Sequence, residues 1–242
     1  MNINVPILLD DEAYSFAYQP IINMTSGTVV SYEALVRGAQ NEPAHKVLEA
    51  LQGEELYRND EGFRIAAIKL AATLGLTCDL NLNFLPLSLE TSVTCIKSTL
   101  DAAKELGIRP DRIILDMTEE EIIRDIKDFT KIINEHRDDG IKFAIDDFGA
   151  SYAGLNLLAD FQPDFIKIDI GLVRSIQSNS LKQAVVKGIV RTGQDLGIDI
   201  IAEGIETPDE YWWFREEGVE LFQGYLFAKP AFQQLPLGCY PV

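Results

Sequence analysis

The chain has 242 residues, 47% of them hydrophobic, and its 38 acidic against 21 basic residues give a net charge of −17. This size allows one large core, so we expect a single domain over residues 1–242 with its core at about residues 14–232. The strong negative charge argues against non-specific binding to DNA, RNA or anionic lipid.

The cysteines and the first residues of the chain indicate the cellular compartment of the protein. The three cysteines are far apart and lack a CxxC spacing, which argues against a disulfide framework or a zinc site and fits a reducing cytoplasm. The opening MNINVPILLDDEAY carries acids where a secretion signal has basic residues, and no apolar run reaches membrane-spanning length. We therefore expect a soluble cytoplasmic protein that does not act at a membrane.

Two β-rich stretches near the start of the chain predict a hairpin. They cover residues 14–23 and 28–36, and a Ser-Gly dipeptide between them supplies turn chemistry. A short helix is predicted over residues 43–51. A longer one follows over residues 55–74, where apolar residues recur at helical spacing.

After the long helix, strands and helices alternate regularly. The predicted strands cover residues 80–86, 112–116, 141–147, 164–169, 198–203 and 219–223. The predicted helices cover residues 91–106, 181–196 and 208–217, with one more helix after residue 116 and a short helical link after residue 147. With the opening hairpin this gives about eight strands, which favours an α/β barrel. A doubly wound sheet is the alternative, because strand order cannot be read from sequence.

Polar side chains recur where these apolar strands end. In IKFAIDDFGASYAGL a buried run stops at Asp146 and Asp147, and two adjacent carboxylates there require a cation, a shared proton or strong hydrogen bonds. The other strand-end residues are Asn83, Asp116, Lys167, Asp169, Glu203 and Gln223. In a parallel barrel these ends meet at one rim, where active sites are built. Taken alone, the Asp pair is better explained as a polar strand end whose Asp caps the next helix, and Asp169 or Glu119 taken singly fits a structural role equally well.

The donor types indicate a hard divalent cation. Carboxylate and amide oxygens without clustered His or Cys suit Mg²⁺ or Mn²⁺, and His45 and His136 fall in predicted helices away from the strand ends. Four or more such donors make two cations about 3.5 to 4 Å apart feasible, which suits displacement at phosphorus. A Schiff base on Lys167, as in an aldolase, is the alternative. The surrounding carboxylates argue against it, because they hold the lysine protonated.

Several short motifs occur in one order along the chain. They are Glu33-Ala34-Leu35 with Arg37, Asn83 in NFLP, Asp146-Asp147-Phe148-Gly149, Lys167-Ile168-Asp169, Ala202-Glu203-Gly204-Ile205-Glu206-Thr207 and Gln223-Gly224-Tyr225. Together they resemble the EAL-domain cyclic-di-GMP phosphodiesterases, from about Tyr18 to Pro230. The resemblance implies a modified (β/α)8 barrel of the TIM type with an antiparallel first strand. It also implies hydrolysis of cyclic di-GMP to linear pGpG in bacterial signalling.

The resemblance further implies two Mg²⁺ or Mn²⁺ ions. The first would be held by Glu33, Asn83, Asp116 and Asp146. The second would be held by Asp146, Asp147 and Glu203. Lys167 would hold the attacking water, with Glu203 or Asp147 as the group that takes its proton.

The same resemblance assigns the remaining site residues. The catalytic set would be Glu33, Lys167, Glu203, Asp147 and Gln223. The side chains that bind or support the substrate would be Arg37, Gln19, Asp169, Glu206 and Tyr225. Arg37 suits a phosphate because its planar fork can bind two oxygens. Glu119 would steady the loop after Asp147.

Two positions depart from the family pattern. Asp116 stands where the Glu-x-Thr-Glu motif has Glu, and it is shorter by one methylene but keeps the donor chemistry, so we predict activity. Ser151 stands where Gly is more usual, and it could stiffen the loop and lower turnover. The alternative function is a catalytically degenerate EAL domain that binds cyclic di-GMP or a protein partner.

The resemblance also implies a homodimer and regulation by a sensory or regulatory protein partner. An aromatic run of Tyr211, Trp212, Trp213 and Phe214 is a candidate for such a contact. Helical periodicity favours core packing for the same run. Both interpretations are open at this point.

Overall fold

The computed structural model describes residues 7–9, 12–51, 54–85, 95–119, 122, 126–150 and 154–239. Its strands are β1 (Ile7–Leu9), β2 (Glu12–Asn23), β3 (Thr28–Gly38), β4 (Asp79–Asn83), β5 (Ile113–Thr118), β6 (Lys142–Phe148), β7 (Phe165–Ile168), β8 (Asp199–Ala202), β9 (Leu221–Phe222) and β10 (Ala231–Phe232). Strands β2 to β9 pair in sequence order, and β9 pairs back to β2. The sheet is therefore a closed barrel of eight strands.

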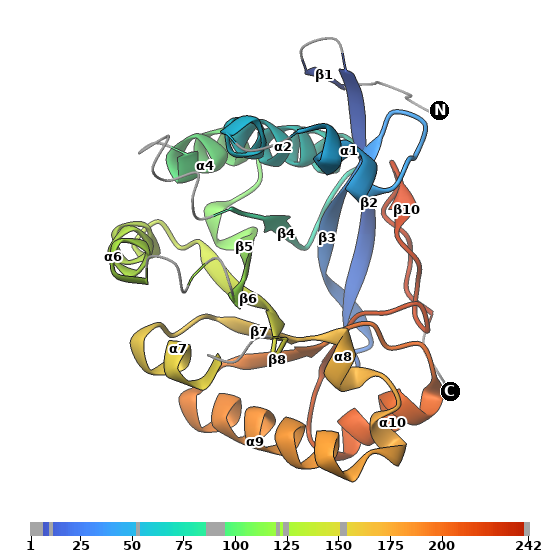
Figure 1. Cartoon of the computed structure of the whole chain (residues 1–242). Coiled ribbons are helices and arrows are strands. Elements are labelled where there is room, and N and C mark those ends of the chain that lie inside the picture. The colour runs from blue at the N-terminus through green and yellow to red at the C-terminus, as the bar shows by residue number, and fades with distance from the viewer. Residues whose placement is uncertain are drawn as a thin grey trace.

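Strand direction confirms the modified barrel. β2 runs antiparallel to both of its barrel neighbours, β3 and β9, whereas β3 to β9 are parallel to one another. The predicted hairpin is present, and it extends beyond the other strands in Figure 1. Because the sheet closes on itself, the doubly wound alternative is wrong.

Helices lie around the outside of this barrel (Figure 1). In the described ranges they are α1 (Ala44–Ala50), α2 (Glu54–Thr73), α4 (Cys95–Glu105), α6 (Ile126–Arg137), α7 (Gly154–Asp160), α8 (Ile170–Val173), α9 (Ser180–Leu196) and α10 (Pro208–Glu216), with short 3-10 turns at Pro110–Arg112 and Ile176–Ser178. The start of α10 has a chemical cause. Thr207 and Glu210 form a reciprocal capping box, and Pro208 occupies the first turn, where its missing N–H costs nothing.

The core contains the apolar residues of the strands and the inner faces of the helices. Phe143, Ile145 and Ile166 are fully buried in adjacent strands. On α10, Tyr211 and Phe214 are also buried, whereas Trp212 keeps 49% of its surface exposed. The core interpretation of the aromatic run therefore holds for Tyr211 and Phe214 and is wrong for Trp212.

Some element bounds differ from the prediction. The strand predicted over residues 80–86 ends at Asn83, since Phe84 and Leu85 have no regular structure. The strand predicted over residues 219–223 shrinks to the two residues Leu221–Phe222, which close the barrel against β2. The start of the helix predicted over residues 91–106 and the departure at Ser151 lie outside the described residues. Within the described ranges, no helix combines the length and the apolar character needed to cross a membrane.

Candidate active site

Glu33 is held at the junction of β2, β3 and β9. It lies in β3 opposite Gln19 of β2, and it is 7% exposed. Gln223, directly after β9, donates from Nε2 to Oε2 of Glu33 at 2.7 Å and also to Oε1 of Gln19 at 3.4 Å. Gln19 in turn donates to the carbonyl of Ala228 at 3.1 Å. The orientation of Glu33 therefore depends on the closure of the barrel.

Asp116 lies in β5 and is 1% exposed. Its Oδ1 accepts a hydrogen bond of 2.7 Å from Nδ2 of Asn81 in β4. Its Oδ2 lies 3.0 Å from Nζ of Lys167. Oδ1 is thus hydrogen-bonded, whereas Oδ2 faces the Lys167 ammonium as an ion pair without a hydrogen bond.

Asp146 and Asp147 come together through an irregularity in β6. Side chains alternate across a regular strand, so two adjacent residues should face opposite sides. Here the register with β7 shifts between Ile145 and Phe148, and Asp147 adopts a left-handed backbone with φ of 52°. Asp tolerates this region better than most residues. The bulge therefore allows both carboxylates to reach the same site.

Lys167 of β7 is the centre of the cluster, and it is fully buried. Its Nζ lies 2.7 Å from Glu203, 3.0 Å from Asp116, 3.2 Å from Asp146 and 3.4 Å from Glu33, measured to the nearest carboxylate oxygen. Burial lowers its pKa, but the four carboxylates, Asp116 first, raise it well above the ordinary value. A lysine held protonated in this way cannot attack a carbonyl, which argues against the aldolase alternative.

The carboxylates outnumber their one buried cation. Burial, opposed by Lys167 and assisted by Glu33 and Asp146, raises the pKa of Asp116 to about 7. Partial desolvation and then the charge of Asp146 raise the pKa of Asp147 to about 6, although the residue keeps an exposed surface. Burial and the same neighbour also raise the pKa of Glu203 well above its usual range. The site is short of positive charge.

The donor set fits divalent cations. Glu33, Asp116 and Asp146 have ligand oxygens within 4.8 Å of one another, and so do Asp146, Asp147 and Glu203. Asp146 belongs to both groups. Two clusters of hard oxygen donors that share a carboxylate, in a site with excess negative charge, match the chemistry of Mg²⁺, Mn²⁺ or Ca²⁺.

A cavity of about 300 Å³ opens above the cluster. It is lined by Glu33, Asp146, Asp147 and Glu203, by Gln19, Gln223 and Glu206, and by Tyr225, whose surface is 54% exposed. The Tyr225 ring has Nζ of Lys229 5.4 Å from its centroid. Arg37 lies near Glu33: burial lowers the pKa of Arg37, and the charge of Glu33 opposes this shift. Positive charge is thus present at the mouth of an otherwise acidic cavity.

Two of the predicted substrate-binding residues have structural partners. Asp169 caps α8 by accepting from the N–H of Gly171 at 2.9 Å. Glu206 lines the cavity but its Oε1 also lies 2.9 Å from Nη2 of Arg174. The cap explanation of Asp169 therefore describes its contacts in this structure.

Glu119 reaches the loop that follows β6. It is 1% exposed, and its Oε2 accepts from the N–H of Gly149 at 3.3 Å. Gly149 has φ of 95°, and a Cβ there would lie 2.5 Å from Cδ1 of Leu172. Glycine is therefore favoured here by the left-handed backbone, and any larger residue would also have to displace the end of the Leu172 side chain.

Asn83 and Asn81 differ in environment. Asn83 is exposed at the end of β4 and donates to the carbonyl of Ala34 at 3.5 Å. Asn81 is fully buried and contacts Asp116 directly. Sequence reasoning identified Asn83 and missed Asn81, although the alternation LNLN places both on one face of the strand. His45 is exposed on α1, and His136 lies on α6 beside Asp139.

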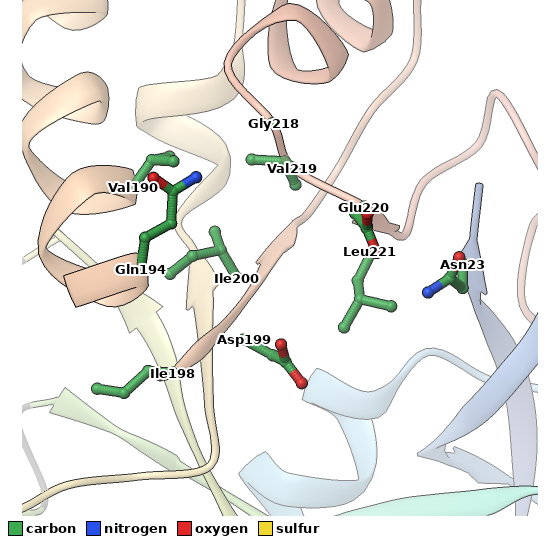
Figure 2. A pocket seen from close by; sticks show the side chains of 10 residues that line it. All are labelled: Asn23, Val190, Gln194, Ile198, Asp199, Ile200, Gly218, Val219, Glu220 and Leu221. Carbon is green, nitrogen blue, oxygen red and sulfur yellow. The ribbon is translucent and has the colours of Figure 1, made fainter. Parts of the chain in front are cut away.

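A second hollow lies at the opposite, amino end of the parallel strands. It has a volume of about 310 Å³, and Figure 2 shows Asp199, Leu221 and Gln194 among its lining side chains. Its acids, Asp199 and Glu220, are exposed. Active sites of such barrels are built at the carboxyl ends, so the cavity above Lys167 is the better candidate.

The chain matches the model of the EAL domain over residues 5–230. It is 33% identical over 227 residues to the blue light- and temperature-regulated antirepressor BluF of Escherichia coli, and 29% identical over 240 residues to the cyclic di-GMP phosphodiesterase PdeR of the same species. These matches cover 93% and 95% of this chain but 56% and 36% of the relatives, so the chain spans about half of their length or less.

The fold also matches a solved structure closely. Klebsiella pneumoniae BlrP1, in its complex with manganese and cyclic di-GMP at pH 6, superposes with a TM-score of 0.91 at 39% identity. The match covers 98% of this chain and 61% of that one. The barrel with one antiparallel strand and the acid clusters at its rim agree with these similarities. The chain therefore belongs to the EAL domain family.

Proposed function

We propose that this chain is a metal-dependent phosphodiesterase that hydrolyses cyclic di-GMP to linear pGpG. The observation that carries this proposal is the pair of carboxylate groups that share Asp146 around the buried Lys167. Relatives named as cyclic di-GMP phosphodiesterases and a similar structure that contains manganese with the dinucleotide support it.

The residues divide the work as follows. Glu33, Asp116 and Asp146, with Asn83 beside them, would hold one cation, and Asp146, Asp147 and Glu203 the other. Two Mg²⁺ or Mn²⁺ ions, when bound, supply an acidified water and neutralise phosphate charge. Nζ of Lys167, among four carboxylates, can donate to a water at the same place and hold it for attack. Glu203 or Asp147, whose pKa values are raised, would take the proton of this water.

Substrate binding is assigned to the mouth of the cavity. Tyr225 offers an exposed ring suited to stacking on a guanine, and Arg37 offers a fork for phosphate oxygens. Gln19, Glu206 and Asp169 complete this set, with Gln19 and Glu206 lining the cavity itself. Glu119 supports the loop that carries Asp147 through the N–H of Gly149.

The shorter acid at position 116 is compatible with this role. A ligand oxygen of Asp116 lies within 4.8 Å of the oxygens of Glu33 and Asp146. The carboxylate therefore reaches the group despite the missing methylene. This geometry favours activity over the degenerate alternative.

The direct test is incubation of the purified protein with cyclic di-GMP and Mg²⁺ or Mn²⁺, followed by chromatography. We expect pGpG with at least one of the metals and none after EDTA treatment. Binding of cyclic di-GMP without product under either metal would overturn the proposal.

A receptor or protein-interaction role is the second candidate. It is favoured by the name of one relative, an antirepressor that is 33% identical to this chain. The two candidates differ in one measurable respect: a pure interaction module does not consume cyclic di-GMP. Product formation in the chromatographic test therefore separates them.

The remaining assignments belong to this proposal. We infer a homodimer and a sensory or regulatory protein partner from the resemblance to the EAL domain family. We also infer a single domain over residues 1–242 that acts in the cytoplasm and binds no DNA or RNA. Sedimentation and cell fractionation test these points.

A further inference from the structure

A row of three buried polar side chains crosses three adjacent strands below the carboxylate cluster. It consists of Ser31 in β3, Asn81 in β4 and Asp116 in β5, which are 3%, 0% and 1% exposed. The backbone register brings them together, since Asn81 is the Cα partner of Glu33 in β3 and of Ile114 in β5. Buried polar groups are costly unless they are paired, so this row needs an explanation.

The contacts in this row fix the orientation of Asn81. The hydroxyl of Ser31 donates to the amide oxygen of Asn81, and the amide nitrogen then donates to Oδ1 of Asp116 at 2.7 Å. An amide that flipped would face the hydroxyl with its nitrogen and the carboxylate with its oxygen. The Ser31 hydroxyl could serve either orientation, since it can donate or accept, but the carboxylate accepts hydrogen bonds and repels the amide oxygen, so Asp116 selects the orientation and Ser31 adds a hydrogen bond to it.

The contact also fixes Asp116. Its Oδ1 is hydrogen-bonded by Asn81, and its Oδ2 faces Nζ of Lys167 at 3.0 Å; one of its two oxygens lies within 4.8 Å of oxygens of Glu33 and Asp146. With one oxygen held from each side, the plane of the carboxylate cannot rotate freely. A hydrogen bond to a charged acceptor is among the stronger ones in a buried site.

From this geometry we propose that Asn81 is a positioning residue for the metal site, acting through Asp116 and held in place by a hydrogen bond from Ser31. Asn81 holds Oδ1 of Asp116 so that Oδ2 points to the cation shared with Glu33 and Asp146. The inference rests on the proposed function in one respect, namely that the carboxylate cluster binds divalent cations. It adds two residues, Asn81 and Ser31, that no motif of the chain had marked.

The test measures Mn²⁺ affinity by titration calorimetry on the purified full chain, without substrate. We expect Asn81→Ala to raise the Kd for Mn²⁺ about tenfold, the usual size of an effect on a residue that supports a metal ligand. Ser31→Ala should raise it less, because the amide remains. A Kd for Asn81→Ala within about twofold of the wild type overturns the proposal.

Tyr18→Phe is the matched control. It removes the hydrogen bond of 2.7 Å from the buried Tyr18 hydroxyl to the carbonyl of Ala67, on the outer side of the barrel wall. We expect its Kd for Mn²⁺ to stay within about twofold of the wild type. An equal rise in both variants would mean that any lost buried hydrogen bond weakens the site, and would overturn the positioning role.

A crystal structure of metal-free Asn81→Ala gives the second measurement. The carboxylate of Asp116 should turn away from its wild-type direction, and an unmoved carboxylate contradicts the proposal. Should Asn81→Ala fail to fold, Ser31→Ala decides by its Kd: a rise beyond the control supports the proposal and an unchanged value overturns it.

The failure of this inference can be told apart from failure of the proposed function. If the wild type binds Mn²⁺ but forms no pGpG, the proposed phosphodiesterase activity is refuted. The positioning role of Asn81 is then still tested by the same comparison of Kd values. pGpG formation with an unchanged Kd for Asn81→Ala removes the positioning role alone. No Mn²⁺ binding by the wild type removes both.

Discussion

Both ends of the barrel carry acidic residues, but these residues differ in their burial and in their ion pairs. At the amino end, Lys142 pairs with Asp79 at 2.7 Å, and their side chains remain 34% and 25% exposed. At the carboxyl end, Lys167 faces Asp116 at 3.0 Å, and their side chains are 1% and 0% exposed. The first is an ordinary surface pair that water and salt can screen. The second is buried, shared with three more carboxylates, and needs further positive charge.

This difference shows what marks a site in a chain with a net charge of −17. Acidic residues are abundant everywhere, so their number distinguishes nothing. Carboxylates that are buried without enough positive charge do distinguish a site, because their burial lowers stability unless a bound ligand offsets the cost.

The largest effect is expected on turnover. Glu33→Ala and Glu203→Ala should each lower the rate of pGpG formation by more than about 10³-fold, since each removes a carboxylate from one of the two groups. Asp199→Ala, at the amino end, should leave the rate within about twofold. Chromatography of the nucleotides measures all three. An undiminished rate in either Glu variant would show that the cations are placed wrongly.

Lys167→Met should have the next largest effect, which is on stability. In metal-free protein we expect the free energy of unfolding to fall by ~3–5 kcal/mol, because removal of the cation leaves buried carboxylates unpaired. Lys142→Met should cost at most ~1 kcal/mol, since its pair is partly exposed. Denaturant unfolding with EDTA measures both. Equal costs at the two ends would contradict the comparison.

The third prediction concerns pH. The pKa of Asp116 is raised to about 7 and that of Asp147 to about 6, so the folded state binds these protons more tightly than the unfolded state. Metal-free protein should therefore lose stability as the pH rises from about 4 through about 7. Metal competes with the same protons, so its affinity should increase over that range. Thermal unfolding at several pH values, with and without Mn²⁺, measures this; a metal-free stability that rises with pH would contradict it.

The smallest effect is expected at the loop after β6. Glu119→Ala removes the acceptor of the Gly149 N–H and should lower turnover about tenfold, because the loop carries Asp147 into the site. Glu105→Ala, an exposed acid at the end of α4, should have no measurable effect. A rate for Glu119→Ala equal to that of Glu105→Ala would show that the loop does not need this contact.

The barrel could be predicted because its signals are local. Apolar strands alternate with amphipathic helices, and a Ser-Gly turn separates the opening pair of strands. The ends of β9 were harder to predict, since its two residues pair with Ile22 and Asn23, about 200 residues away in the chain. The gathering of acids at one rim followed from strand direction alone.

The inner layer of the site could not be predicted in the same way. The hydrogen bond between Asn81 and Asp116 depends on the register of β4 and β5, which no local pattern fixes. The left-handed backbone of Asp147 depends on the bulge against β7. The pair between Glu206 and Arg174 likewise joins two loops whose approach is set by packing.

The closure of the barrel has a consequence for its motions. Ten residue pairs join β2 to β3, whereas two join β9 to β2 and two join β9 to β8, so β9 is the most weakly paired strand of the wall. Local opening starts where the fewest backbone hydrogen bonds must break. Gln223, which holds Glu33, follows this strand directly. Fraying of β9 would therefore release Glu33 from Gln223. The short pairing that closes the barrel thus also limits how long the carboxylate cluster keeps its arrangement.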